Sequence, residues 1–246
     1  MLRLRSFFYF LWFLVVSIAM HLVAVPTLVL PRKAVVWMAQ TWSALLIWGL
    51  KAFAGLDYEV RGPVPKGGVL VASKHMSMWD TLALYMLLDD PIVVIKRELQ
   101  RVPFYGWFAT RADMIFVDRK GYAGALRRMA AHAARATAAG RGLIIFPEGT
   151  RVKPGAAPSY KSGIAGLYEL LHLPCVPVAL NSGLFWTGFA KKPGKIVVEF
   201  LPVIPAGLPR KEFMRRLENS IEGETARLVA EGRKMLGTAA DGEIRG

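Results

Sequence analysis

The 246-residue chain has one cysteine and few charged residues, and each shortage excludes a class of protein. The single cysteine, Cys175, excludes an internal disulfide and a zinc site built from cysteines. Charged residues make up 20% of the chain against 54% hydrophobic residues, so disorder, collagen and coiled coil are excluded. The patterns G-x-x-x-x-G-K-[ST], G-x-G-x-x-G, G-x-S-x-G and H-E-x-x-H are absent, and common NTPase, dehydrogenase and hydrolase functions therefore lose support.

Acidic residues are absent from the first 53 positions, which carry five basic residues. The rest of the chain holds +9 of the net charge of +14, so both parts are basic. Lys and Arg attract phosphates, whether these belong to lipids or to nucleic acid. Nucleic acid would not explain the apolar N-terminal end, and a basic and aromatic nucleic-acid motif is missing. The charge therefore predicts a membrane bilayer and anionic substrates as partners, and no nucleic acid.

Two apolar stretches make up most of the N-terminal end. Residues 7–30 carry no formal charge if His21 is neutral, and as a helix they reach about 36 Å, enough for a hydrocarbon core of about 30 Å. Residues 34–53 follow the Pro31-Arg32-Lys33 break and contain three tryptophans, which favour the bilayer interface. The sequence therefore predicts a segment that enters or lies on a membrane.

Three arrangements of this segment fit the sequence. Two full spans would place Arg32 and Lys33 outside, against the positive-inside tendency, whereas a hairpin in one leaflet avoids that conflict. We favour a membrane-embedded or interfacial two-helix motif over residues 1–54. One span plus an interfacial helix, and a cleaved signal peptide, are the alternatives. The signal peptide fits least, because its apolar region would be too long and its cleavage pattern is poor.

Residues 55–246 alternate short apolar runs with helical stretches, as is typical of one α/β domain, here of a size that suits a catalytic domain. The expected strands are 58–61, 69–73, 92–95, 114–117, 143–146, 176–180 and 196–200. The expected helices are 80–88, 105–111, 122–139, 164–171 and 210–235. The predicted fold class is α/β: a mostly parallel sheet flanked by helices, with an N-terminal membrane-associated two-helix motif.

Among the four histidines, His75 is the candidate for chemistry. It follows an expected strand, where α/β proteins commonly build their sites, and Asp80 stands five residues later in K-H-M-S-M-W-D. On one helix these side chains would point about 140° apart, so a turn must intervene. With Asp80 in the first turn of the next helix, its carboxylate can orient one imidazole nitrogen and leave the other free as a base. The alternative is that Asp80 only caps a helix and His75 packs under it.

A second polar group, F-P-E-G-T-R, follows the strand expected at 143–146. Gly149 lets backbone N–H groups approach an anion, Thr150 adds a hydroxyl donor and Arg151 offers a forked partner for phosphate. Cationic residues also follow two other strands, at Lys96 and Arg119. Parallel strands would bring these three cations to one edge of the sheet, where a phosphate can bind. The alternative is a β-turn with a surface salt bridge.

These motifs together resemble the four blocks of the glycerolipid acyltransferase family, in particular the 1-acyl-glycerol-3-phosphate acyltransferases. The blocks are K-H-M-S-M-W-D, M-I-F-V-D-R, F-P-E-G-T-R and V-P-V-A-L, and the resemblance covers about residues 58–201. It implies that His75 is the general base and Asp80 its orienting partner. It also implies an acceptor-phosphate site formed by Arg119, Glu148, Gly149, Thr150 and Arg151.

Two further positions match family members, and one departs from the family pattern. Lys96, in K-R-E-L, and Pro177, in the fourth block, occupy matching places. Lys74 stands where the family usually shows Asn before the histidine. Lys74 either aids phosphate binding or is merely tolerated.

The resemblance implies transfer of an acyl chain from acyl-CoA or an acyl carrier protein to 1-acylglycerol 3-phosphate (lysophosphatidic acid), giving phosphatidic acid. His75 would take the proton of the acceptor hydroxyl, with no metal and no bound cofactor. We expect a cell inner membrane or its equivalent as the location, with the catalytic domain on the cytoplasmic side. The alternatives are acylation of a lyso-ornithine lipid, another lysophospholipid or glycerol 3-phosphate, and a non-catalytic membrane lipid-binding protein.

Overall fold

A mostly parallel β-sheet forms the centre of the molecule. The computed structural model describes residues 1–117 and 123–243 of the chain. The strands are β1 (Leu56–Arg61), β2 (Leu70–Ser73), β3 (Ile92–Lys96), β4 (Ile115–Val117), β5 (Leu143–Ile145), β6 (Cys175–Leu180), β7 (Trp186–Thr187), β8 (Ala190–Lys191) and β9 (Gly194–Phe200). Seven of them pair in the order β1-β9-β6-β2-β5-β3-β4, with every pair parallel except β6 and β9, while β7 and β8 form a separate hairpin.

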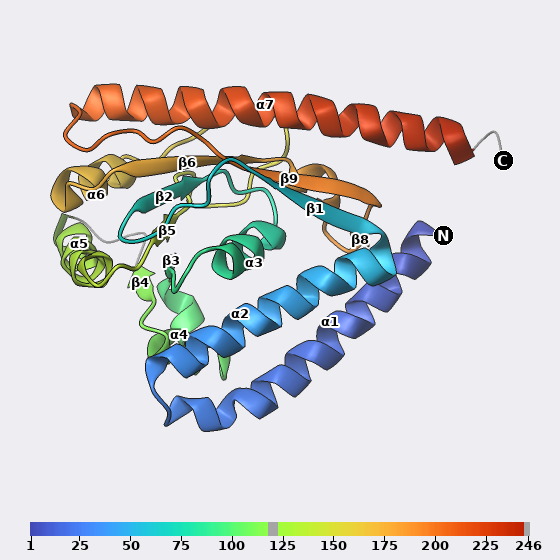
Figure 1. Ribbon diagram of the computed structural model, residues 1–246, viewed down its shortest axis with the longest axis horizontal. Coiled ribbons are helices and arrows are strands. Elements are labelled where there is room, and N and C mark those ends of the chain that lie inside the picture. The colour runs from blue at the N-terminus through green and yellow to red at the C-terminus, as the bar shows by residue number, and fades with distance from the viewer. Residues whose placement is uncertain (118–122, 244–246) are drawn as a thin grey trace.

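Helices cover both faces of this sheet. The α-helices are α1 (Leu2–Ala24), α2 (Arg32–Gly49), α3 (Met78–Leu87), α4 (Tyr105–Arg111), α5 (Ala123–Ala138), α6 (Gly163–Leu171) and α7 (Arg210–Glu243). Shorter helical segments are η1 (Val25–Leu28), η2 (Leu50–Ala54), η3 (Arg97–Arg101) and η4 (Ser182–Leu184). In Figure 1, α7 runs along the top of the sheet, and α3, α2 and α1 lie below it. The α/β fold class predicted from the sequence is therefore confirmed.

The alternation of side chains along the strands explains the two layers of helices. In β2, Leu70 and Ala72 pack with α5, α6 and α7, whereas Val71 between them packs with α2 and α3. In β5, Leu143 and Ile144 divide in the same way. All of these side chains are buried, as expected for parallel strands covered on both faces. Because β2, β5, β3 and β4 are parallel, their carboxyl ends meet at one edge of the sheet.

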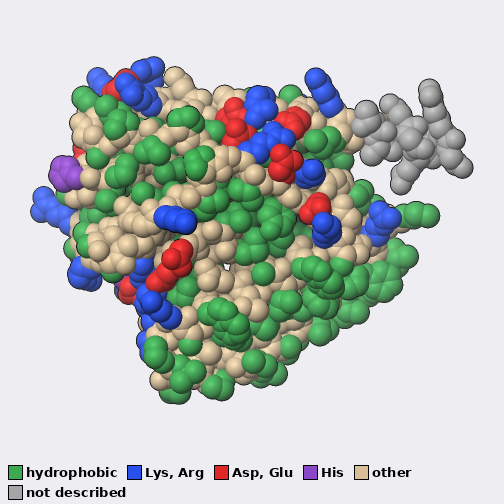
Figure 2. All heavy atoms as spheres, viewed as in Figure 1, with side chains coloured by type: hydrophobic (Ala, Val, Ile, Leu, Met, Phe, Trp, Pro, Cys, Tyr) green, Lys and Arg blue, Asp and Glu red, His purple; other side chains and the backbone are tan. Residues whose placement is uncertain are grey.

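The two N-terminal helices differ in how they are packed. Helix α2 is a core helix, because Val35, Leu46 and Ile47 are buried in the same hydrophobic cluster as α3. Helix α1 packs on α2 but leaves Ile18 and Leu22 more than 60% exposed. The segment Leu2–Leu28 is the one helix in the described residues long and apolar enough to cross a membrane. Figure 2 shows hydrophobic side chains concentrated over this side of the molecule, with charged side chains gathered at the top and left.

The expected elements are present, with shifted boundaries. Helix α3 starts two residues before the expected position because Ser77 caps it, and α7 continues to Glu243. The hairpin of β7 and β8 and the four short helical segments were not expected. Residue 122, where the helix expected at 122–139 was to start, lies outside the described residues.

The packing of α1 and α2 predicts different effects of substitution. We expect Leu46→Ala, which opens a cavity beneath α3, to lower the free energy of unfolding by about 2–5 kcal/mol. We expect Ile18→Ser, on the exposed face of α1, to change it by less than about 0.5 kcal/mol. Denaturation of the purified protein in one detergent measures both. Equal losses for the two variants would contradict the assignment of α2 to the core and of α1 to the surface.

Candidate active site

The turn between β2 and α3 brings His75 and Asp80 into contact. Ser77 is the extended N-cap residue of α3, and Asp80 is the third residue of the helix, so the two form a capping box. The backbone N–H groups of Met76 and Ser77 donate to Asp80 Oδ2 at 2.6 and 2.8 Å. His75 Nδ1 lies 3.0 Å from the same oxygen. The intervening turn that the five-residue spacing requires is thus present.

Asp80 both caps the helix and contacts the imidazole, so the contact that an orienting role requires is present together with the helix cap. Its carboxylate is fully buried, and the hydroxyl of Ser182 in η4 donates to Oδ1. The His75 ring stacks on Phe146 with the ring centres 4.0 Å apart. Its Nε2 has no hydrogen-bond partner among the residues that the structure describes, and the side chain is 12% exposed. A base of this kind has one nitrogen oriented and the other available to a substrate.

Two residues that support the pair were not singled out from the sequence. Ser77 carries a local signal, because S-M-W-D has the spacing of a capping box. Ser182 carries none, since it lies 102 residues after Asp80 in sequence. Only the pairing of β2 with β6 brings Ser182 to the site.

The F-P-E-G-T-R segment forms a turn after β5 with an exposed cationic end. The Gly149 N–H donates to the Phe146 carbonyl at 2.9 Å, and Gly149 has a φ of 66°, a conformation that favours glycine. Thr150 and Arg151 are exposed, and Arg151 makes no hydrogen bond or ion pair within the described part of the chain. The next residue, Val152, donates its N–H to the His75 carbonyl at 2.9 Å, which holds the turn beside the histidine.

The other two cationic candidates follow β3 and β4. Lys96 is the last residue of β3 and is exposed at the same edge of the sheet as His75 and the turn after β5. Arg119 lies outside the described residues. The structure therefore places His75, Lys96 and Arg151 at one edge, as the parallel order of the strands requires.

Glu148 has different surroundings from the rest of its motif. Its carboxylate is buried and accepts from Lys74 Nζ at 2.7 Å. The same ammonium group lies 2.8 Å from Glu222 of α7, which also accepts from the Tyr160 hydroxyl at 2.9 Å. Burial raises the pKa of the Glu148 carboxyl group, and the Lys74 ammonium opposes that rise. The turn has an ion pair, but it is buried rather than on the surface.

Lys74 is therefore committed to two carboxylates. Its side chain is 2% exposed, so it points into the protein rather than toward a bound phosphate. A buried ammonium group requires counter-charge, and Glu222 supplies negative charge here. An asparagine at position 74 would be neutral and would not need this partner. This interaction joins the start of the first motif to the C-terminal helix.

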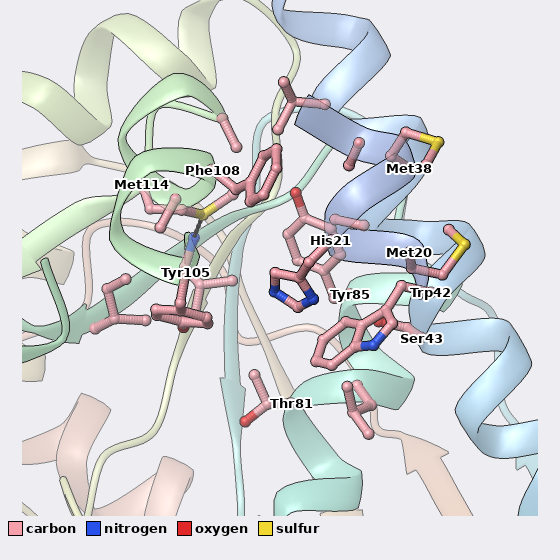
Figure 3. A pocket seen from close by; sticks show the side chains of 18 residues that line it. Met20, His21, Met38, Trp42, Ser43, Thr81, Tyr85, Tyr105, Phe108 and Met114 are labelled. Carbon is pink, nitrogen blue, oxygen red and sulfur yellow. Dashed lines mark hydrogen bonds between the residues drawn. The ribbon is translucent and has the colours of Figure 1, made fainter. Parts of the chain in front are cut away.

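An apolar cavity lies on the side of the sheet covered by α1 to α4. Its empty space is about 830 Å³, including the part open to solvent. Thr81, the neighbour of Asp80 in α3, lines it. Figure 3 shows the His21 imidazole projecting into it, with Tyr105 and Phe108 on one side and Trp42 on the other. His21 Nδ1 is held by the Ser17 carbonyl at 2.6 Å.

A free imidazole nitrogen at a sheet edge, a cationic loop beside it and a separate apolar cavity are together the features expected of an enzyme for an anionic substrate with a long apolar part. The comparisons agree with this class. A family model described as Acyltransferase matches residues 57–181. The 1-acyl-sn-glycerol-3-phosphate acyltransferase of Pseudomonas aeruginosa is 34% identical over 199 residues, which are 79% of this chain and 72% of that one.

More distant relatives extend the comparison. The 1-acyl-sn-glycerol-3-phosphate acyltransferase alpha of Mus musculus is 31% identical over 170 residues, 65% of this chain and 59% of the mouse protein. The crystal structure of the 1-acyl-sn-glycerophosphate acyltransferase PlsC from Thermotoga maritima has the same fold, with a TM-score of 0.75 and 19% identity. It covers 93% of this chain and 98% of its own. The chain belongs to the acyltransferase family, and it is an enzyme.

The His75 and Asp80 geometry predicts how their variants behave. We expect His75→Ala to lower the rate of acyl transfer about 10²- to 10⁴-fold with little change in thermal stability, because the base acts on chemistry. Asp80→Asn should lower it in the same direction, since orientation and charge stabilisation are lost. Rates from thioester consumption, with melting curves as the control, measure both effects. A folded His75→Ala protein with near wild-type turnover would rule out this base.

The Lys74 interactions predict a coupled effect on stability. Lys74→Met leaves Glu148 buried without counter-charge and should lower the free energy of unfolding by about 3–5 kcal/mol.

Glu222→Gln should lower the free energy of unfolding less in a Lys74→Asn background than in the wild type, with a coupling energy of about 0.5–3 kcal/mol. Denaturation of the wild type, Glu222→Gln, Lys74→Asn and the double variant measures this coupling energy. Glu212→Gln, which breaks only the surface ion pairs with Arg215 and Arg216 on α7, is the control and should cost less than about 1 kcal/mol. If the costs of Glu222→Gln and Lys74→Asn simply add in the double variant, the proposed coupling through Lys74 is contradicted.

Proposed function

We propose that this enzyme transfers an acyl chain from an acyl thioester to the free hydroxyl of 1-acylglycerol 3-phosphate, giving phosphatidic acid. The observation that carries the proposal is the contact of His75 Nδ1 with the buried Asp80 carboxylate at 3.0 Å, in a chain 34% identical to the Pseudomonas aeruginosa enzyme of that name. A base with one oriented nitrogen suits removal of a hydroxyl proton.

The reaction steps follow from this geometry. His75 Nε2 takes the proton of the acceptor hydroxyl as the oxygen attacks the thioester carbonyl. The new C–O ester bond forms, the C–S bond breaks, and the imidazolium returns the proton to the leaving thiolate. The buried Asp80 keeps the imidazole oriented and stabilises its positive charge during the step. The proposed mechanism uses no metal and no bound cofactor, and the donor is either acyl-CoA or an acyl carrier protein.

The acceptor phosphate is proposed to bind at the exposed edge of the sheet. Arg151 has no partner within the described ranges and follows the turn that is tied to His75 through Val152. The N–H groups around Gly149, the Thr150 hydroxyl and Lys96 add donors at the same edge. Arg119, which lies outside the described residues, is proposed as a further phosphate ligand because of the family resemblance of its motif. Glu148 contributes by holding Lys74 rather than by contacting the phosphate, since two anions repel each other. Phosphate binding would thereby position the hydroxyl near His75.

The apolar parts of both substrates are proposed to approach from a bilayer that contacts α1. Exposing an acyl chain to water costs about 0.8 kcal/mol per CH₂ group, so a site for such chains has to open toward lipid. The exposed face of α1 and the apolar cavity that reaches from Met20 to Thr81 supply such a route. The thioester arrives from the cytoplasm, so we propose the inner membrane or its equivalent, with the catalytic domain on the cytoplasmic side.

An acceptor panel tests the proposal together with Arg151→Ala. The purified enzyme is assayed with lysophosphatidic acid, glycerol 3-phosphate, a lyso-ornithine lipid and a phosphate-free lyso-lipid, each with acyl-CoA and with acyl carrier protein. We expect lysophosphatidic acid to give the highest kcat/KM. Arg151→Ala should lower that value about 10- to 100-fold, the worth of a charged hydrogen bond, and Arg151→Lys should restore it only in part.

The acceptor panel also distinguishes the proposed function from the alternative functions. A higher kcat/KM for another acceptor would replace the proposed substrate, and no thioester consumption with any acceptor would favour a non-catalytic lipid-binding protein. Unchanged activity of Arg151→Ala at subsaturating lysophosphatidic acid would contradict phosphate binding at this position.

A further inference from the structure

A group of exposed apolar side chains lies outside the N-terminal helices and the active site. It is formed by Leu99 in η3 (37% exposed), Val102 (43%) and Phe104 (38%) between η3 and α4, and Trp107 in α4 (55%). We call these four residues the η3–α4 patch. None of them lines the apolar cavity. Clustered apolar exposure of this kind marks a contact surface for another molecule.

Basic residues flank the η3–α4 patch. Arg97 and Arg101 belong to η3 and are exposed, and their guanidinium groups make no hydrogen bond or ion pair with any residue that the structure describes. The segment also contains one acidic residue, Glu98, so its net charge is still positive. Apolar side chains next to unpaired arginines suit a surface that presents hydrocarbon and negative charge together.

The backbone holds Phe104 in an unfavourable conformation at this surface. Phe104 is the N-cap residue of α4 and has a φ of 61°, in a region that bulky residues rarely adopt. Its ring lies 5.2 Å from the ring of Trp107 and 6.4 Å from that of His21 in the last turns of α1. The η3–α4 patch is therefore continuous with α1, whose nearby residues Leu22 and Val23 are more than 60% exposed.

Helix α4 separates this surface from the apolar cavity. Tyr105, Phe108 and Ala109 line the cavity, whereas Trp107 is exposed on the outside. An acyl chain that moves from a bilayer into the cavity near α1 would pass beside this helix. A contact of α4 with lipid would thus bring the wall of the cavity against the membrane.

We infer that the η3–α4 patch is a second bilayer-contacting element, with Val102 and Trp107 in the interfacial region and Arg97 and Arg101 on anionic headgroups. The inference rests on the proposed contact of α1 with a bilayer. It adds a lipid contact made by the catalytic domain itself, at the opposite end of α1 from the β7–β8 hairpin. Continuity with the exposed face of α1 favours a bilayer over an acidic protein, because a single bilayer can contact both, and Trp favours the membrane interface.

The experiment places an environment-sensitive fluorophore on single cysteines of the full-length protein. The variants are Val102→Cys in the patch, Ile18→Cys on α1 as the reference, and Leu170→Cys and Val203→Cys as controls of similar exposure. Cys175 is buried, and burial raises the pKa of its thiol, so the native cysteine stays unlabelled. Each protein is mixed with vesicles of phosphatidylcholine, with and without phosphatidylglycerol.

We expect the emission at positions 102 and 18 to shift to the blue with vesicles, and that at positions 170 and 203 to stay unchanged. Replacing Arg97 and Arg101 together by Gln should raise the concentration of phosphatidylglycerol vesicles needed for half of the shift at position 102. Each arginine near an anionic surface contributes about a fivefold change, so the pair should give roughly tenfold or more. Melting curves confirm that the variants are folded.

The outcomes separate this inference from the proposed function. A shift at position 18 without one at position 102 would overturn the second contact and leave the bilayer contact of α1 intact. No shift at either position would remove the bilayer contact of α1 as well. A shift at position 102 that acyl carrier protein produces and vesicles do not would assign the patch to protein docking, and equal shifts at positions 170 and 203 would show unspecific adsorption.

Discussion

The buried carboxylate of Asp80 connects the start of a helix to the candidate base, and the local arrangement of the site depends on it. Two backbone N–H groups, the Ser182 hydroxyl and the His75 imidazole all meet this one group. Because Asp80 caps α3, the backbone at the start of the helix fixes the position of its carboxylate. The interaction that ends the turn after β2 therefore also orients the imidazole. The cap of α3 and the orientation of the candidate base thus depend on the same side chain.

The Lys74 ammonium group extends this arrangement to distant parts of the chain. It joins the residue before the base, the turn after β5 through Glu148, and the C-terminal helix through Glu222. Buried ion pairs add little net stability, but removing one partner is costly. The three segments are thus held in one relative position. The exposed Arg151 end of the turn is then presented on a rigid support, which suits recognition of a phosphate.

The N-terminal helices have two different roles. Helix α2 completes the hydrophobic core against α3, and α1 covers α2 while presenting an apolar face outward. Between them and the sheet lies the apolar cavity, so the segment that is suited to lipid also forms a wall of the cavity. The proposed membrane contact and the proposed acyl path are in this way parts of one structure, which two independent spanning helices could not provide.

Local patterns in the sequence determined the elements of the fold and the residues of the site. The runs of β-branched residues and the helical stretches predict the strands and α-helices of the main sheet, and K-H-M-S-M-W-D predicts the turn that joins His75 to Asp80. These predictions succeed because hydrophobic periodicity and capping act over a few residues. The strand order could be anticipated only as mostly parallel. The antiparallel pair of β6 and β9 depends on contacts between segments far apart in sequence.

Tertiary structure alone decided which charged and polar groups meet. Ser182 reaches Asp80 and Glu222 reaches Lys74 across 102 and 148 positions, and no local pattern links them. The sequence showed Lys74 as a departure from a family pattern, but its buried position and its two partners follow only from the packing of α7. Likewise, two similar apolar stretches at the N-terminus became one core helix and one surface helix. Composition measures how apolar a helix is, whereas its neighbours decide which of its faces is covered.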